Sequence, residues 1–221
     1  MGQEIIPVYF MPGMAASPKI FEHIKLPENQ FEIHYLEWMI PLKNELLSAY
    51  ALRLSKCINH DNVVLLGVSF GGVLVQEIAK HISVRKLIIV SSVKSMRELP
   101  KRMLITKATK AYKLIPTQLA SNIDACAKLA FGGNINKRLE LYKKYLSVND
   151  STYLSWAIEN MVRWDQKDSD PKIIHIHGDN DPVFPLKNIK QCIIIKGGTH
   201  IMIINKYKWF NENLPRIILE T

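Results

Sequence analysis

The chain has 221 residues, a length that fits one domain with a substantial buried core. Hydrophobic residues make up 48% of it and charged residues 22%, which excludes a disordered or fibrous protein. No apolar run approaches the roughly 20 residues that span a bilayer, and no secretory signal pattern opens the sequence. The three cysteines are widely spaced and form no CxxC pair. We therefore expect a cytoplasmic protein with reduced thiols and no membrane span.

The formal net charge of +9 is concentrated in one segment. Between Lys94 and Lys167 there are 14 basic and 6 acidic side chains, whereas the rest of the chain has 15 and 14. Such a segment can attract an anionic substrate, a nucleic acid or a membrane surface. It can also be a solvated helical face that keeps the protein soluble, which is the interpretation we favour. Because no nucleic-acid-binding motif accompanies the charge, we expect no nucleic-acid partner.

Short apolar segments alternate with amphipathic ones along the chain. Brief apolar runs are typical of buried strands, and apolar side chains repeating on one face at helical spacing indicate helices. In chain order the sequence predicts strands at 5–10 and 31–38, a helix at 43–57, a strand at 62–66, a helix at 72–82, strands at 86–90, 172–177 and 192–195, and a helix at about 203–213.

This alternation predicts an α/β fold with a mostly parallel sheet of about six strands flanked by helices. Residues 95–166 interrupt the pattern, because they contain no strong strand signal and predict helices at 138–146 and 153–164. We expect residues 1–94 and 167–221 to form the core, and residues 95–166 to form a helical cap inserted before the penultimate strand. The cap would lie above the carboxyl ends of the strands, where open parallel sheets bind their ligands.

The motif GVSFGG at residues 67–72 follows an apolar strand and precedes a helix. That context is typical of a nucleophile elbow, in which a serine sits on a sharp turn with its Oγ above the sheet. The flanking glycines allow the strand and helix backbones to pass closely. The alternative is a tight turn in which Ser69 only caps the helix. The pattern favours Ser69 as a catalytic nucleophile.

Two further motifs follow later strands and offer an acid and a base. The segment HGDNDPVFP at residues 177–185 contains two carboxylates, Asp179 and Asp181, either of which could orient a histidine. Gly-Asp turns also occur without function, so this motif leaves both candidates open. The segment GGTH ends in His200, directly after the last strand. The serine, the acid and the histidine therefore stand in the order that a hydrolytic triad on this type of sheet requires.

The loop after the first strand, MPGM at residues 11–14, could complete the site. Acyl transfer needs two backbone N–H groups directed at the developing oxyanion. We expect one from Phe70, the residue after the nucleophile, and the other from Met14, because Gly13 permits a close approach. The alternative is a plain Pro-Gly turn.

Together these four features resemble the α/β-hydrolase superfamily, over nearly the whole chain from residue 5 to about residue 210. The resemblance implies Ser69 as nucleophile and His200 as base. It assigns Asp181 as the triad acid through the family's D-x-x-x-P pattern, with Asp179 as the second candidate. The chain departs from the family in having Pro-Gly where His-Gly is common, and in lacking the two usual leading strands. The variable cap of the family would correspond to residues 95–166.

The resemblance implies a serine hydrolase that cleaves an ester or related acyl bond of a small to medium substrate through an acyl-enzyme, without a metal or cofactor. Thioester, lactone or C–C bond cleavage on the same triad is an alternative, because fold and triad do not decide the bond. A non-catalytic binding protein on the same scaffold is another. Neither the substrate nor the oligomeric state follows from the sequence.

The cap offers a candidate substrate pocket on one predicted helix. Trp156, Met161 and Trp164, together with Ile158, are apolar and lie within about two helical turns, so we expect them to face the active site. The alternative is that these side chains pack the cap onto the core.

Overall fold

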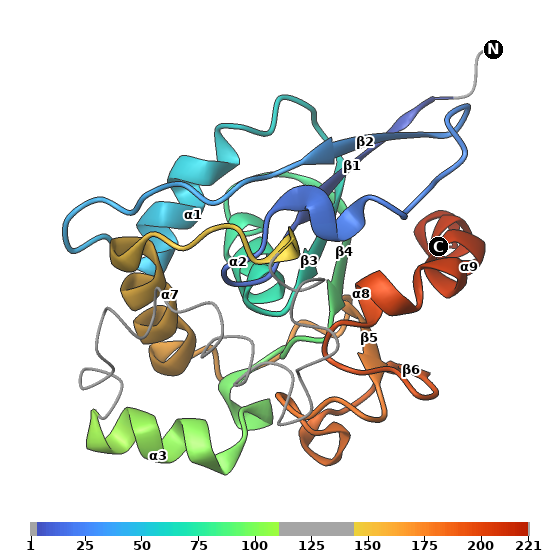
Figure 1. Ribbon diagram of the computed structural model, residues 1–221. Helices are drawn as coiled ribbons and strands as arrows, with labels where there is room; N and C mark the ends of the chain where they lie inside the picture. Colours follow the sequence, from blue (N-terminus) through green and yellow to red (C-terminus); the bar gives the residue numbers. More distant parts are fainter. Residues whose placement is uncertain (1–3, 111–143, 221) are drawn as a thin grey trace.

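The structure is a computed structural model that describes residues 4–110 and 144–220 (Figure 1). Its centre is a six-stranded sheet with the order β2-β1-β3-β4-β5-β6, in which every neighbouring pair is parallel. The predicted α/β class with about six strands is therefore confirmed. The strands are β1 Ile6–Met11, β2 Phe31–Tyr35, β3 Val63–Val68, β4 Val84–Val90, β5 Ile174–Gly178 and β6 Ile193–Ile195.

Helices cover both faces of this sheet, which is why the central strands are apolar on both sides. In Figure 1, α1 and α2 lie on one side of the sheet, and α8 and α9 lie on the other. All six residues of β3 are buried as a result. The helices are α1 Leu47–Ser55, α2 Phe70–Ile78, α3 Lys101–Thr109, α7 Ser151–Arg163, α8 Met202–Asn205 and α9 Tyr207–Leu219, and short 3-10 turns occur at Pro18–Phe21, Met96–Glu98 and Leu186–Asn188.

Several elements have other boundaries than predicted, and three of these differences bear on the fold. Strand β2 ends at Tyr35 rather than at residue 38. Helix α2 begins at Phe70 rather than at residue 72, because the chain turns from strand to helix at a single residue. The predicted last helix is two helices, α8 and α9, which meet at Lys206. Apolar periodicity runs through that junction, so the pattern predicted one continuous helix.

The described parts of residues 95–166 contain the helices α3 and α7 and no strand. Helix α7 begins where the Asp150 carboxylate accepts a hydrogen bond from the Tyr153 amide at 2.8 Å, a side-chain N-cap. The α7 and α3 helices contact each other. Most of the predicted helix at 138–146 lies outside the described residues.

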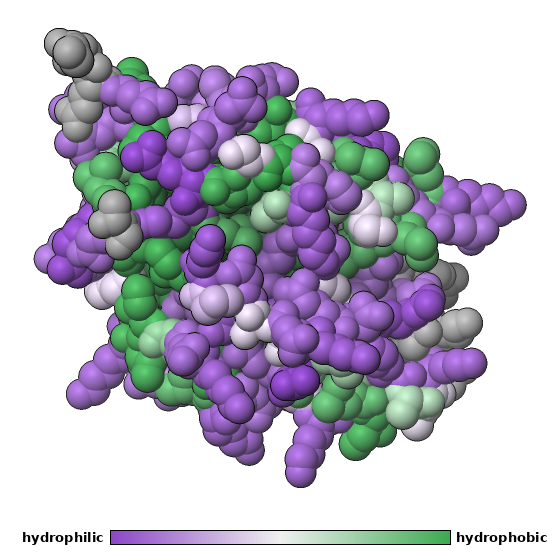
Figure 2. All heavy atoms as spheres, turned by 180° about the vertical axis from the view of Figure 1, so that it is seen from behind, coloured by the Kyte–Doolittle hydropathy of each residue, from purple (hydrophilic) through white to green (hydrophobic). Residues whose placement is uncertain are grey.

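Seen from behind, the surface is mainly hydrophilic, and apolar residues form separate patches between the charged side chains (Figure 2). No helix within residues 4–110 and 144–220 is both long and apolar enough to cross a membrane.

Close backbone contact fixes the position of α2 against the sheet. A Cβ on Gly67 would overlap the carbonyl of Gly71, and a Cβ on Gly71 would overlap the carbonyl of Pro12. Neither contact can be relieved by a side-chain rotation, because both partners are backbone. The two glycines therefore set how closely the first turn of α2 approaches β1 and β3.

We expect Gly71→Ala to lower the free energy of unfolding by about 1–3 kcal/mol or more, because the new methyl group forces backbone atoms apart. Gly13→Ala is the matched control. A Cβ there would lie 3.4 Å from the Ser69 Cβ, an ordinary van der Waals contact. Urea denaturation of both variants measures the difference. Equal stability of the two variants would contradict this account of the close approach.

Candidate active site

Ser69 occupies a strained turn between β3 and α2. Its backbone has φ 54° and ψ −121°, a conformation that costs a non-glycine residue on the order of 1–3 kcal/mol. Backbone hydrogen bonds hold it there. The Ser69 amide donates to the Val90 carbonyl at 2.9 Å, and the Ser69 carbonyl accepts from the Gly72 amide at 2.9 Å and the Ser92 hydroxyl at 2.7 Å. The turn thus places the Ser69 side chain just beyond the carboxyl end of β3, where it lines a cavity.

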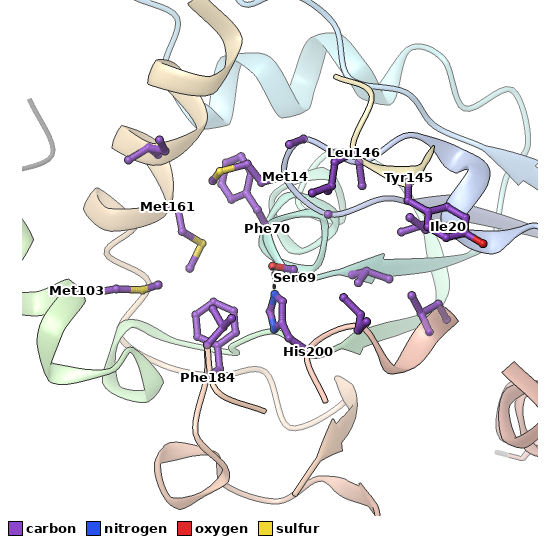
Figure 3. Close-up of a pocket in the computed structure, with 18 of the residues that line it drawn as sticks. Met14, Ile20, Ser69, Phe70, Met103, Tyr145, Leu146, Met161, Phe184 and His200 are labelled. Carbon is purple, nitrogen blue, oxygen red and sulfur yellow. Dashed lines mark hydrogen bonds between the residues drawn. The ribbon is translucent and has the colours of Figure 1, made fainter. Parts of the chain in front are cut away.

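A hydrogen-bonded chain runs from this serine to a buried carboxylate. His200 Nε2 lies 2.9 Å from Ser69 Oγ (Figure 3). On the other side of the ring, His200 Nδ1 lies 2.9 Å from Asp181 Oδ2. Because Asp181 Oδ2 can only accept, Nδ1 carries the proton and Nε2 is free to accept from the serine. The three side chains come from loops that follow β3, β5 and β6. The imidazole is thus oriented to take a proton from Ser69.

The Asp181 carboxylate is fixed on both of its oxygens. Oδ1 accepts from the Val183 amide at 2.8 Å and from the Phe184 amide at 3.0 Å, which leaves Oδ2 for His200. Burial opposes ionisation of this carboxyl, but the neighbouring His200 and the Phe184 amide outweigh burial, so the pKa of Asp181 lies below its ordinary value. The group is therefore charged at neutral pH.

The structure brings Asp181 to His200 and keeps Asp179 away from it. Asp179 is exposed, and its Oδ1 accepts from the Gly197 amide at 2.7 Å. It therefore joins the loop after β5 to the loop after β6. The two carboxylates that the local motif left open have different partners.

Two backbone amides face the same cavity as Ser69. Phe70 is the first residue of α2, so its N–H has no partner within the helix. The Met14 N–H makes no hydrogen bond to any residue in the described segments. Both residues line the cavity next to Ser69. They can donate to an oxygen that becomes negative there.

Trp38 supports this pair of amides and was not identified from the sequence. Its indole N–H donates to the Gly13 carbonyl at 2.9 Å, and its ring stacks on the Phe70 ring at 5.4 Å and 6°. The Tyr153 hydroxyl accepts from the Ala15 amide at 3.4 Å on the other side of the loop. The sequence predicted Trp38 as the end of a strand, and only the fold brings it against the loop after β1.

A cavity of about 350 Å³ opens beside Ser69, within the size range of small-molecule sites. In Figure 3 apolar side chains from the core and from α3 and α7 surround the Ser69–His200 pair. Few polar groups line it, and Arg102, on α3, is engaged by the Pro182 and Val183 carbonyls. The larger apolar side chains of the wall include Met14, Ile20, Met103, Leu146, Ile158, Met161 and Phe184.

Two of the expected cap residues do not belong to this wall, which corrects the sequence prediction. Met161 lines the cavity, whereas Trp156 and Trp164 do not. The Trp156 indole N–H donates to the Glu45 carbonyl at 2.7 Å, and the Trp164 indole N–H donates to the Glu77 carboxylate at 2.9 Å. An indole N–H that is shielded from solvent needs an acceptor, and here Glu45 in the segment before α1 and Glu77 of α2 supply them.

No protein-family model matches the sequence, and no curated protein does. Solved structures do resemble the whole chain. An esterase from Exiguobacterium antarcticum has a TM-score of 0.69 at 19% identity, over 100% of this chain and 94% of that chain. An enol-lactonase from Burkholderia xenovorans has 0.69 at 12%, over 98% and 92%. A bromoperoxidase from Bacillus anthracis has 0.64 at 16%, over 99% and 93%.

The chain has the α/β-hydrolase fold. In this fold the loop that carries Asp181 rests on two histidines of β5, His175 and His177. His177 Nε2 donates to the Phe184 carbonyl at 2.8 Å, and its Nδ1 accepts from His175 Nε2 at 3.0 Å. Both rings are buried. They position the segment that carries Asp181.

Burial keeps both histidines neutral. It lowers the pKa of His175 to about 3, and it also lowers the pKa of His177. In the unfolded chain a histidine titrates near pH 6.5. Below that pH the unfolded chain binds protons that the folded protein does not bind, so folding becomes less favourable.

We expect stability to be highest above about pH 6.5 and to fall progressively as the pH drops from 6.5 towards 3. His175→Gln should reduce this slope, because the neutral side chain has no proton to gain. His81→Gln, which changes an exposed histidine, is the control and should keep it. The measurement is the midpoint of thermal unfolding at a series of pH values. An unchanged slope in His175→Gln would exclude His175 as its source.

Proposed function

We propose that the protein is a serine hydrolase that cleaves a carboxylic ester of a small to medium acyl substrate through an acyl-enzyme on Ser69. One observation carries the proposal: the hydrogen-bonded chain of Ser69, His200 and Asp181 opens into an apolar cavity beside two unpaired backbone amides. A serine, an oriented imidazole, a carboxylate and oxyanion donors are together the groups that acyl transfer requires.

The reaction begins when Ser69 Oγ attacks the ester carbonyl carbon while His200 Nε2 takes the serine proton. The Met14 and Phe70 amides donate to the oxyanion of the tetrahedral intermediate. His200 then gives its proton to the departing alcohol oxygen, which leaves the acyl group bonded to Ser69. A water molecule, deprotonated by His200, then attacks the acyl carbon. As the bond between this carbon and Ser69 Oγ breaks, His200 returns the proton to Oγ and the acid is released. Throughout, Asp181 holds the imidazole and stabilises its protonated form.

The division into core and cap belongs to the same proposal. Residues 1–94 and 167–221 carry the triad, and residues 95–166 form the cap that contributes α3 and α7 to the acyl side of the cavity. We place the reaction in the cytoplasm, on a small-molecule substrate rather than a nucleic acid.

Thioester or lactone cleavage is the second candidate, because the same acyl-enzyme forms from either bond. The enol-lactonase among the similar structures supports keeping it. A binding protein without turnover is a weaker candidate, because all three triad side chains are present within hydrogen-bond distance.

We expect Ser69→Ala to lower kcat/KM for a p-nitrophenyl ester by about 10⁴-fold, and Asp181→Asn by about 10³- to 10⁴-fold. Asp179→Asn is the matched control for the acid and should stay within a few-fold of the unmodified protein. Ser48→Ala, on the exposed side of α1, is the control for the serine. Steady-state kinetics and labelling by a fluorophosphonate probe are the two measurements.

The two readouts distinguish the candidates. Labelling of Ser69 without turnover of the p-nitrophenyl ester would favour thioesters or lactones as the substrates. No labelling and no turnover would favour the binding protein. Full activity in Ser69→Ala would refute the assignment of the nucleophile.

The apolar cavity predicts a dependence on acyl length. Each methylene buried in the cavity adds up to about 0.8 kcal/mol, or about fourfold in kcat/KM, until the cavity is full. Met161→Trp should move the optimum to shorter chains, because the indole occupies part of the cavity. Ile105→Trp, on the exposed face of α3, is the control and should leave the optimum unchanged. The test is a series of p-nitrophenyl esters of increasing acyl length, and a flat profile would be inconsistent with binding of the chain in this cavity.

A further inference from the structure

Three side chains that commonly ligate metals meet at the edge of the sheet. Glu32 and His34 are two residues apart on β2, so both project from the same face of that strand. His60 approaches them from the connection between α1 and β3. One ligand atom from each of the three residues lies within 4.8 Å of the other two. None of them lines the cavity beside Ser69.

The spacing of the first two ligands suits a tetrahedral ion. His34 Nε2 lies 3.4 Å from Glu32 Oε1. In a tetrahedral zinc site, bonds of about 2.0–2.1 Å separate neighbouring ligand atoms by about 3.4 Å. His34 Nε2 is also buried and has no hydrogen-bond partner among the described residues. A buried, unpaired ring nitrogen needs a partner, and an ion held between the three groups would supply it.

Tyr9 holds both imidazoles in place. It is the β1 partner of His34, and the two rings stack at 4.6 Å and 17°. Its hydroxyl lies 2.8 Å from His60 Nδ1 and also accepts from the Asn59 amide at 3.2 Å. Because Nδ1 of His60 is engaged, Nε2 is the nitrogen left for an ion. Histidine ligands typically have such a hydrogen bond on the second nitrogen, which orients the ring.

We propose that Glu32, His34 and His60 bind one divalent transition-metal ion of the Zn²⁺ type, with water as the fourth ligand. Two imidazoles and one carboxylate favour zinc, copper or nickel over Mg²⁺ and Ca²⁺, which prefer oxygen ligands. The ion would fasten the edge strand β2 to the α1–β3 connection, so it stabilises the fold. It takes no part in acyl transfer.

The test is a calorimetric titration of the full chain with Zn²⁺ alone, which measures the stoichiometry and the affinity of binding. We expect one equivalent to bind to the unmodified protein, and His34→Gln and His60→Gln to lose at least about 100-fold in affinity. Tyr9→Phe keeps the ring but removes the hydroxyl, and should weaken binding about 10- to 100-fold. His81→Gln, which changes an exposed histidine at the end of α2, is the matched control and should bind as the unmodified protein does.

A second measurement separates lost ligands from lost folding. With excess chelator, His34→Gln and His81→Gln should unfold at nearly the temperature of the unmodified protein, and added Zn²⁺ should raise it only in His81→Gln and the unmodified protein. Esterase activity should be the same for His34→Gln and His81→Gln, so a failure of the proposed hydrolase function leaves this test intact. Equal Zn²⁺ binding by all variants, or no stoichiometric binding to the unmodified protein, would overturn the proposal.

Discussion

The strained backbone of Ser69 is the constraint on which the remaining geometry depends. A residue with φ 54° reverses the chain within one position, so α2 begins at the very next residue. That reversal is possible only where glycines let the helix approach the strand, as Gly67 and Gly71 do. It also leaves the Phe70 amide at the helix N-terminus, beside the Ser69 side chain and without an intrahelical partner. One backbone conformation thus places both the Ser69 hydroxyl and an amide without an intrahelical partner at the cavity.

Asp181 and His200 come from loops that are supported separately from the Ser69 turn. They meet Ser69 through one hydrogen bond, between His200 and Ser69. Asp181 accepts hydrogen bonds from amides of its own loop. His177 of β5 and Arg102 of α3 in turn donate to backbone carbonyls of that loop. His200 follows β6, a strand at the opposite edge from β2. The contact between His200 and Ser69 therefore depends on the register of β3, β4, β5 and β6. The sheet acts as the rigid element that sets a distance of 2.9 Å between two separately supported groups.

Local sequence patterns predicted the strands and the turn at Ser69, because these features depend on residues that are close together in the sequence. Apolar runs gave the strands, because both faces of a parallel sheet are buried. The glycines around Ser69 gave the turn, because no side chain fits there. The partners of single side chains depend on distant residues and could not be predicted. Asp179 and Asp181 follow the same strand, and the local motif left both open. The family resemblance favoured Asp181, and the fold brings Asp181 to His200 and Asp179 to Gly197. Trp156 and Trp164 were wrongly predicted to line the cavity, because their hydrogen-bond acceptors lie far away in the sequence.

Two of the described cations in residues 95–166 are engaged by backbone carbonyls. Lys107 of α3 donates to the Arg163 and Trp164 carbonyls at the end of α7, where a cation interacts favourably with the helix dipole. Arg102 binds two carbonyls of the acid loop. These cations join α3 to α7 and to the loop that carries Asp181, while the described residues that line the cavity are mainly apolar. A charged group would lose its hydration inside this cavity without gaining a partner, so the interior favours an apolar group.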